Sequence, residues 1–188
     1  MNPGVMYDQL CDILSQDTFH FDSPYWSDKR VNNLLEGEKG LNGKETKLPT
    51  YWNTPFSKIC LGMRIGPNIS FIVIDKEANS LHSLIADGQY RATSLGRDTW
   101  KSLIGSQGTL QTACGREGFN SGCSVAGASR ARIGIVANNV QECGGCDSRV
   151  GFGTGGYIDD TNTCGNVGPD SSDNGEKNFK AMGYILVQ

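Results

Sequence analysis

A run of acidic residues near the carboxyl end is the pattern in this sequence best suited to metal binding. No lysine or arginine lies between Ile158 and Glu176. Oxygen ligands grouped around a glycine turn are what a hard cation such as calcium requires. The spacing does not match an EF-hand, and a solvated acidic loop is the alternative interpretation. The candidate calcium ligands are Asp159, Asp160, Asp170, Asp173 and Glu176.

Cys143-Gly-Gly-Cys146, with Cys164 further along, is the second pattern that could carry chemistry. The pair could be a redox dithiol or half of a zinc site. Because the sequence has neither a second Cys-x-x-Cys nor a histidine pair, structural disulfides are favoured. A bond between Cys146 and Cys164 would close a loop of about 18 residues, worth about 3 kcal/mol from chain entropy. The spacing does not fix the connectivity.

The cysteine content indicates an oxidising compartment. Seven cysteines are an odd number, so one thiol is free or pairs with another molecule. The glycosylation sequon at Asn68 fits a secretory route. The first residues do not read as a signal peptide, so we expect a mature or partial chain whose signal has been removed. Disulfide candidates are Cys60, Cys114, Cys143, Cys146 and Cys164, and the unpaired or intermolecular candidates are Cys11 and Cys123.

Residue patterns for catalysis are weak, and we predict that the protein is not an enzyme. His20 lies among aromatic residues and His82 in an expected helix, and neither has the neighbours of a catalytic triad. Residues 151–156 satisfy G-x-G-x-x-G, but turn residues follow them instead of the helix that a dinucleotide site needs. Three tryptophans could stack on sugars, but core packing is favoured for each: Trp26, Trp52 and Trp100.

Length and charge narrow the class of protein. With 188 residues, the chain is long enough for one domain with a real core. A net charge of −3 and a pI near 5.4 argue against a nucleic-acid-binding face. The sequence has no apolar run of about 18 residues, so we expect no membrane span.

The hydrophobic pattern predicts an α+β, mainly β fold with few short helices and long ordered loops. Residues 1–17 read as an atypical segment with a short helix over 7–14, and 28–50 as surface loop. Short helices are expected at 80–86 and 98–103, the second capped by Asp98 or Thr99. The expected strands are 59–65, 70–74, 131–137 and 181–187.

Several segments resemble the fibrinogen C-terminal-like domains of invertebrates, especially the cnidarian-type group. They are 18–27, 45–55, 83–91 with Trp100, and 146–156 through Cys164-Gly-Asn166 to 182–187. The layout of the carboxyl-terminal part is also similar to intelectin-type lectins. The resemblance covers residues 18–188 and implies an extracellular, disulfide-bonded, non-enzymatic module with a central antiparallel sheet and long disulfide-bonded loops. Such relatives bind glycans or acetylated groups, often with calcium, or occur in extracellular matrix.

This sequence departs from those families in three respects. Residues 1–17 lack the usual Gly-Gly-Trp-Thr opening strand, and a missing strand would leave a sheet edge open for another chain. The calcium motif of vertebrate fibrinogen-like domains has no direct match. The histidine-bearing sugar pocket of intelectins is also missing, because no histidine follows His82. Tyr157 is the aromatic residue of the acidic loop that we nominate for ligand binding.

Two functions from different classes follow from these patterns. The favoured one is a secreted structural or adhesive module that self-associates into a matrix or fibre, with residues 1–17 as a connecting arm. The alternative is a calcium-dependent lectin or pattern-recognition module that binds extracellular glycans. The partners expected are therefore further copies of the chain or glycans, and not nucleic acid.

Overall fold

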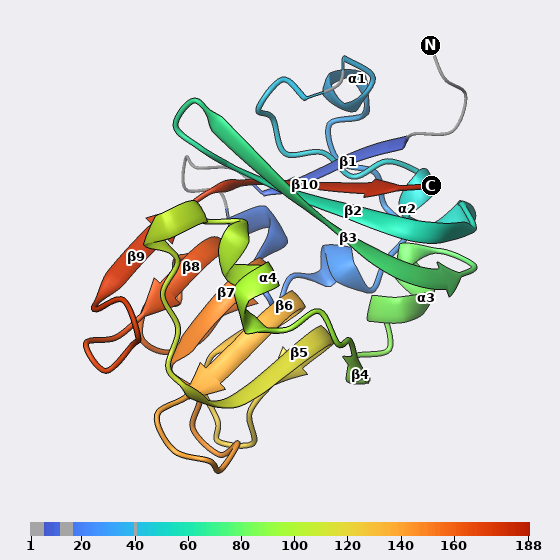
Figure 1. Ribbon diagram of the computed structural model, residues 1–188. Coiled ribbons are helices and arrows are strands. Elements are labelled where there is room, and N and C mark those ends of the chain that lie inside the picture. The colour runs from blue at the N-terminus through green and yellow to red at the C-terminus, as the bar shows by residue number, and fades with distance from the viewer. Residues whose placement is uncertain (1–5, 12–16, 40) are drawn as a thin grey trace.

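Two antiparallel sheets form the framework of the protein in the computed structural model, which describes residues 6–11, 17–39 and 41–188 (Figure 1). Within these residues, one sheet has four strands in the order β1-β10-β2-β3, and the other has six in the order β4-β5-β6-β7-β8-β9. The strands are β1 (Met6–Cys11), β2 (Phe56–Ile65), β3 (Asn68–Ala78), β4 (Arg91–Ala92), β5 (Ala113–Gly122), β6 (Arg130–Asn138), β7 (Ser148–Gly155), β8 (Cys164–Gly168), β9 (Lys177–Lys180) and β10 (Met182–Val187).

Helices in the described residues are short and lie in the connections between strands. The capping box of α3 joins Ser80 and Ser83, each side chain accepting from the other's backbone N–H. The helices are α1 (Leu34–Gly37), α2 (Thr50–Asn53), α3 (Leu81–Ile85) and α4 (Arg97–Ser102), with 3-10 turns η1 (Asp17–Phe19), η2 (Pro24–Trp26) and η3 (Gly105–Gln107). The prediction of a mainly β fold with few short helices is confirmed, although the strands divide between two sheets.

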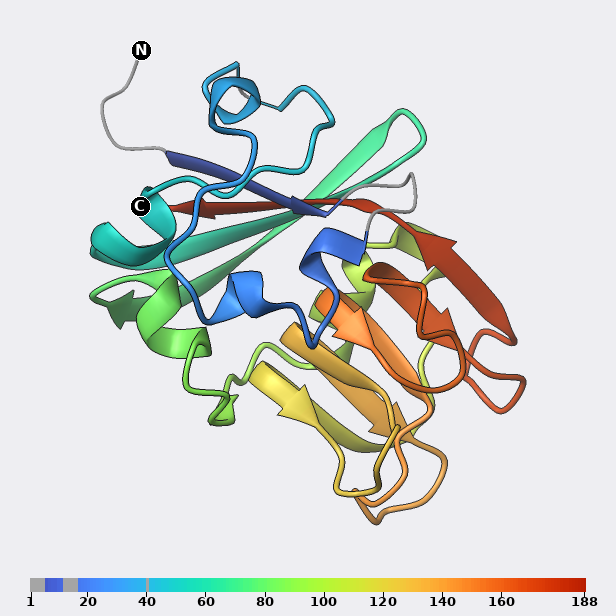
Figure 2. The same ribbon diagram turned by 180° about the vertical axis from the view of Figure 1, so that it is seen from behind.

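The main apolar core of the described residues contains side chains from both sheets. Ile59 and Ile185 enter it from the four-stranded sheet, and Ile133 and Phe152 from the six-stranded sheet. The sheets are also linked covalently, because β9 runs directly into β10 through buried Ala181 (Figure 2). The core also holds Trp26 and Trp100, as predicted, and Trp52 packs against it.

The strands predicted at 59–65 and 70–74 and the helices predicted at 80–86 and 98–103 are confirmed, with one correction to a helix cap. β2 and β3 pair around the turn at Gly66, whose φ of +58° favours glycine. The strand predictions at 131–137 and 181–187 correspond to β6 and β10. Helix α4 begins at Arg97 after Gly96, so neither Asp98 nor Thr99 is its cap. The Gly96 backbone N–H instead donates to the Glu117 carboxylate at 2.9 Å, which fixes the helix start.

The expected helix over residues 7–14 is wrong where the structure describes it. Met6–Cys11 is strand β1, which pairs with β10 so that Met6 lies opposite Val187. Residues 12–14 lie outside the described part. Strand pairing along β10 supplies the hydrogen bonds that a helix would have made internally. The proposed role of residues 1–17 as an assembly arm stays a prediction.

The density of glycine after Cys146 predicts a loop-built surface, but this stretch forms a buried strand in the structure. β7 is buried along its whole length between β6 and β8. Gly151 lies opposite Gly134 of β6. A Cβ added at Gly134 would lie 2.4 Å from the Val150 carbonyl oxygen, and one at Gly151 would lie 2.6 Å from that of Ile133. Glycine is therefore required here for close strand approach rather than for flexibility.

The disulfide bonds correct several cysteine assignments. Cys114 pairs with Cys143, and Cys123 pairs with Cys146. The suggested bond between Cys146 and Cys164 is therefore wrong, and Cys123 is not an unpaired cysteine. Cys60, which we expected in a disulfide, is unpaired on β2. The spacing of the cysteines could not reveal these pairs, because the strands β5 and β6 bring them together.

No helix in the described part of the chain is long and apolar enough to cross a membrane. Asn68 is exposed at the first position of β3, beside the hairpin turn. Glycosylation there stays a prediction. The side chain of Cys11 lies outside what the structure describes.

Candidate ligand-binding site

The adjacent carboxylates of Asp159 and Asp160 have different partners. Asp160 Oδ1 lies 3.0 Å from His20 Nε2 and also accepts from the Gly156 backbone N–H. These hydrogen bonds, first from Gly156 and then from His20, lower the pKa of Asp160 from its ordinary value. Asp159 Oδ1 accepts from the backbone N–H of Thr161 at 2.9 Å and from its hydroxyl at 2.6 Å. The two carboxylates therefore do not act as a pair.

The remaining acidic candidates also have their own surroundings. Asp173 Oδ2 accepts hydrogen bonds from Arg97 at 2.9 Å and from Lys101 at 2.7 Å. Asp170 and Glu176 are exposed. Asp173 is thus neutralised by two cationic side chains of helix α4.

The possible metal ligands converge at a different place from the one that the sequence suggested. Among the described residues, the one group of three or more His, Cys, Asp or Glu ligand atoms within 4.8 Å of one another is Cys114, Cys123 and Cys146. All of these are disulfide-bonded, so their sulfur atoms are not thiolate ligands. Calcium ligation by the acidic residues stays a prediction of the sequence.

Two surface hollows meet at Asp160, where the loop between β7 and β8 lies beside the segment at 20–24. One hollow, of about 440 Å³, is lined by His20, Asp22, Ser23, Pro24, Asp160 and Thr161. The other, of about 360 Å³, is lined by Gly127, Arg130, Gly156, Tyr157, Ile158 and Asp160. We call this surface the Tyr157 site.

The segment at 20–24 is held on the six-stranded sheet by arginine side chains. Arg130 donates to both carboxylate oxygens of Asp22, at 3.0 and 2.7 Å. The ring of Phe21 has the Arg130 guanidinium 4.5 Å from its centre and that of Arg132 at 4.3 Å. Such a two-bonded ion pair and cation–π contacts fix orientation as well as adding attraction. Strand β6, which carries both arginines, therefore positions one wall of the site.

Both ring nitrogens of His20 are engaged. The backbone N–H of Asp22 donates to Nδ1 at 3.2 Å, so the proton belongs on Nε2, which faces Asp160. Trp26 Nε1 donates to the His20 carbonyl at 2.9 Å, which anchors the backbone.

Tyr157 is held at its backbone while its side chain projects into solvent. Its N–H donates to the Gly127 carbonyl at 2.7 Å, and its own carbonyl accepts from Ser129 Oγ at 2.6 Å. The residue is 61% exposed, and the neighbouring Ile158 is also exposed. Because its backbone is already held, only the side-chain torsions of Tyr157 lose freedom when a ligand covers the ring.

Arg149 lies under the loop and contacts its backbone from below. The side chain comes from β7 and is fully buried. It donates to Ser129 Oγ at 3.0 Å and to carbonyl oxygens of the loop at Gly156, Tyr157, Asp159 and Asn162. Burial lowers the pKa of Arg149 to about 10, so the guanidinium stays charged at neutral pH.

The sequence pattern predicted Tyr157 and Asp160 of this site, but it missed Asp22 and Arg130 of the lining and Arg149 beneath the loop. Arg130 and Arg149 lie in strands whose other residues are mostly small or apolar. A charged residue inside such a run is the signal that could have marked them, because an arginine is rarely buried without partners. The partners themselves come from distant segments, which no local pattern predicts.

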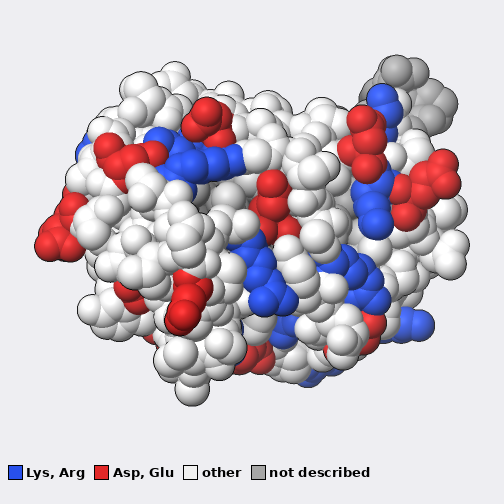
Figure 3. All heavy atoms as spheres, turned by 60° about the horizontal axis from the view of Figure 1, so that its bottom comes forward, with Lys and Arg blue, Asp and Glu red and all other residues white. Residues whose placement is uncertain are grey.

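Charge at this end of the molecule is mixed. Figure 3 shows acidic and basic side chains interspersed over the face that carries the loops of the six-stranded sheet. The ion pair of Arg130 with Asp22 is one example. A ligand would therefore be selected by individual hydrogen bonds and stacking more than by a broad electrostatic field.

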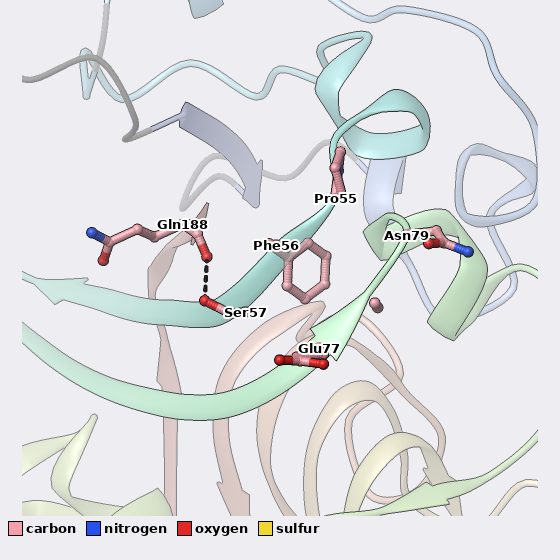
Figure 4. Close-up of a pocket in the computed structure, with 7 residues that line it drawn as sticks. Pro55, Phe56, Ser57, Glu77, Asn79 and Gln188 are labelled. Carbon is pink, nitrogen blue, oxygen red and sulfur yellow. Dashed lines mark hydrogen bonds between the residues drawn. The ribbon is translucent and has the colours of Figure 1, made fainter.

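A larger hollow of about 650 Å³ lies at one end of the four-stranded sheet (Figure 4). Ser57 Oγ donates to the Gln188 carbonyl at 3.3 Å, and Glu77 provides its charged side chain. Figure 4 shows the side chains of Glu77, Asn79 and Gln188 spread around the hollow rather than directed to one point. Because no polar groups converge, this hollow is a weaker candidate than the Tyr157 site.

No protein-family model, curated protein or solved structure matches this chain. The resemblance to fibrinogen-like domains rests on the sequence segments alone and stays a prediction. Any function must therefore be argued from the chemistry of the site itself.

Proposed function

We propose that this chain is a non-enzymatic extracellular recognition and adhesion module that binds carbohydrate at the Tyr157 site. The two disulfide bonds in the described residues support an oxidising, extracellular setting. Glycan binding is the alternative function that the sequence predicts, and the Tyr157 site is the surface that we assign to it.

The observation that carries the proposal is the exposed ring of Tyr157 on a fixed backbone between two hollows. Aromatic faces stack on the apolar faces of sugar rings, and nearby polar groups hydrogen-bond the hydroxyls. Asp160 and Arg130 offer an acceptor and a donor within the lining of one hollow. These are the groups that a neutral, hydroxyl-rich ligand needs.

The titratable groups of the site support binding rather than catalysis. His20 and Asp160 are hydrogen-bonded to each other, and Asp22 is paired with Arg130. General acid–base catalysis requires a group free to exchange a proton with the substrate. Because these side chains are bonded to one another, the site is suited to holding a ligand rather than to transferring protons.

Binding to a panel of immobilised mono- and oligosaccharides tests the proposal. We expect Tyr157→Ala to weaken binding at least about tenfold, which corresponds to about 1.4 kcal/mol. Phe71→Ala removes an exposed aromatic side chain from β3 and is the matched control. If no saccharide binds the unmodified protein, or if the two variants bind equally well, the proposal is wrong.

Self-association is the second candidate, and an apolar stripe on β3 favours it. Ile69, Phe71 and Val73 alternate along this edge strand and are exposed, Phe71 at 46% and Val73 at 51%. Exposed apolar residues on a long edge strand are typical of strands that pair with another chain. This surface fits the matrix or fibre component that the sequence favoured.

Light scattering without reductant tests self-association. A mass well above 20.3 kDa is expected, falling to that of one chain in Phe71→Ser/Val73→Ser. Leu35→Ser, which changes an exposed apolar residue elsewhere, should leave the mass unchanged. A monomeric unmodified protein would remove this candidate.

A further inference from the structure

The loop that carries Tyr157 is built around a buried positive charge supplied by the protein. The carbonyl oxygens of Gly156, Tyr157 and Asn162 lie 3.2, 2.9 and 3.3 Å from the guanidinium nitrogens of Arg149. The Asp159 carbonyl accepts from the same guanidinium. Backbone carbonyls that converge on one centre are characteristic of loops that bind calcium. Here that centre is a side chain.

The carboxylates of the loop form hydrogen bonds with groups other than the Arg149 guanidinium. Asp160 accepts from His20 and from the Gly156 backbone N–H, and Asp159 accepts from Thr161. Calcium takes six to eight oxygen ligands, with carboxylates among them. A calcium ion could use the loop carbonyls only by displacing Arg149 and rotating both aspartates. The residues present therefore do not fit a calcium ion at this place.

Arg149 is also fixed more rigidly than a surface cation would be. Its own position in β7 pairs with Val136 of β6 and with Val167 of β8. Asn166 Nδ2 donates to the Arg149 carbonyl at 2.9 Å. The guanidinium thus approaches the loop from the middle of the six-stranded sheet, and its planar fork can bond several carbonyls at once.

We infer that Arg149 replaces a metal ion as the centre of the loop at 156–162, so that this loop is ordered without calcium. Resting on the proposed function, the inference further implies that sugar binding at the Tyr157 site is calcium-independent. This departs from the calcium-dependent recognition that the resemblance implied. Arg149 is a positioning residue, because it acts on the ligand surface through the backbone of Tyr157.

Hydrogen exchange of the loop amides tests the inference without any ligand. In the unmodified protein, exchange at Gly156 and Tyr157 and the unfolding temperature should be the same with excess calcium and with excess EDTA. Arg149→Gln should exchange at least tenfold faster at these amides, and calcium should not restore protection. Arg116→Gln, which also removes a partly buried arginine from the six-stranded sheet, is the control and should keep the loop protected.

Either of two results would overturn the inference. One is slower loop exchange or a higher unfolding temperature of the unmodified protein with calcium than with EDTA. The other is a folded Arg149→Gln protein with unchanged loop exchange. If Arg149→Gln does not fold, the comparison of the unmodified protein in calcium and in EDTA still tests whether calcium orders the loop. Failure to bind any saccharide would contradict the proposed function but leave the exchange results standing.

Discussion

His20 Nε2 lies 3.0 Å from Asp160 Oδ1, joining segments that are 140 positions apart in the sequence. The contact connects the segment at 20–24 to the loop between β7 and β8. A Cβ added at Gly155 would lie 2.6 Å from His20 Nε2, so the ring fits closely against the end of β7. The pair therefore joins the two segments that line the first hollow of the Tyr157 site.

Removing the carboxylate of this pair should loosen the site. We expect Asp160→Ala to lower the free energy of unfolding by about 2 kcal/mol, because hydrogen bonds to charged groups contribute about that much. Asp160→Asn should cost less, since its amide oxygen can still accept. Urea unfolding measures both, with exposed Asp170→Ala as the control. Equal stability of Asp160→Ala and the unmodified protein would contradict the expectation.

The contacts of Asp173 should make stability depend on acid pH. Burial alone would raise the pKa of Asp173, but hydrogen bonds from Lys101 and Arg97 outweigh it and lower the pKa from 3.8 to about 2. Because the pKa of Asp173 is lower in the folded than in the unfolded state, the charged carboxylate stabilises the fold at pH values above 3.8. This contribution is lost as the pH falls from 3.8 towards 2.

Unfolding experiments between about pH 5 and pH 2 test this dependence. Asp173→Asn should be less stable than the unmodified protein near pH 5, and the difference should shrink as the pH falls. Asp75, which pairs with Lys58 at 3.9 Å on an exposed surface, provides the control in Asp75→Asn. A difference for Asp173→Asn that stays constant over this range would refute the expectation.

Glu117 should be a structural carboxylate rather than a binding residue. It accepts from Trp100 Nε1 at 2.8 Å, from Thr93 Oγ1 at 2.7 Å, and from the backbone N–H groups of Leu95 and Gly96 at 2.9 Å. Burial opposes its charge, yet these donors together lower its pKa. In Glu117→Gln, an NH2 group replaces one of the accepting oxygens and faces groups that are themselves donors. We therefore expect a loss of about 2 kcal/mol in unfolding free energy.

Tryptophan fluorescence during unfolding reports on this site, because Trp100 contacts Glu117 directly. A changed emission of folded Glu117→Gln is expected together with the lower stability. Glu77→Gln, at an exposed position on β3, should change neither quantity. A stability loss below about 0.5 kcal/mol would show that the charge of Glu117 is not needed.

The disulfide between Cys123 and Cys146 should contribute about 3 kcal/mol, given its sequence separation of 23 residues. We therefore expect Cys123→Ser/Cys146→Ser to unfold at a clearly lower temperature. Cys60→Ser removes an unpaired thiol and is the control. Mass spectrometry of unreduced peptides checks the pairing itself, and a Cys146–Cys164 peptide would contradict it.

Local sequence patterns were sufficient to predict the strands and helices that depend on neighbouring residues alone. The apolar pattern predicted the strands at 59–65 and 70–74, which form the β2–β3 hairpin, and the helix at 80–86, which corresponds to α3. The same reasoning failed at β1 and β7. Met6–Cys11 is a strand because β10 pairs with it, and the glycines of β7 are strand residues because Gly134 faces Gly151 across the sheet.

The mainly β composition, the two buried tryptophans and the residue types of the acidic loop follow from local sequence patterns. How those residues act depends on the partners that they meet in the folded chain. The tertiary structure brought His20 to Asp160, paired Cys123 with Cys146, and placed Arg149 beneath the carbonyl group of Tyr157. The physical reason is that each contact joins segments brought together by strand pairing and a shared core, and side-chain chemistry depends on the partner within about 3 Å rather than on sequence neighbours.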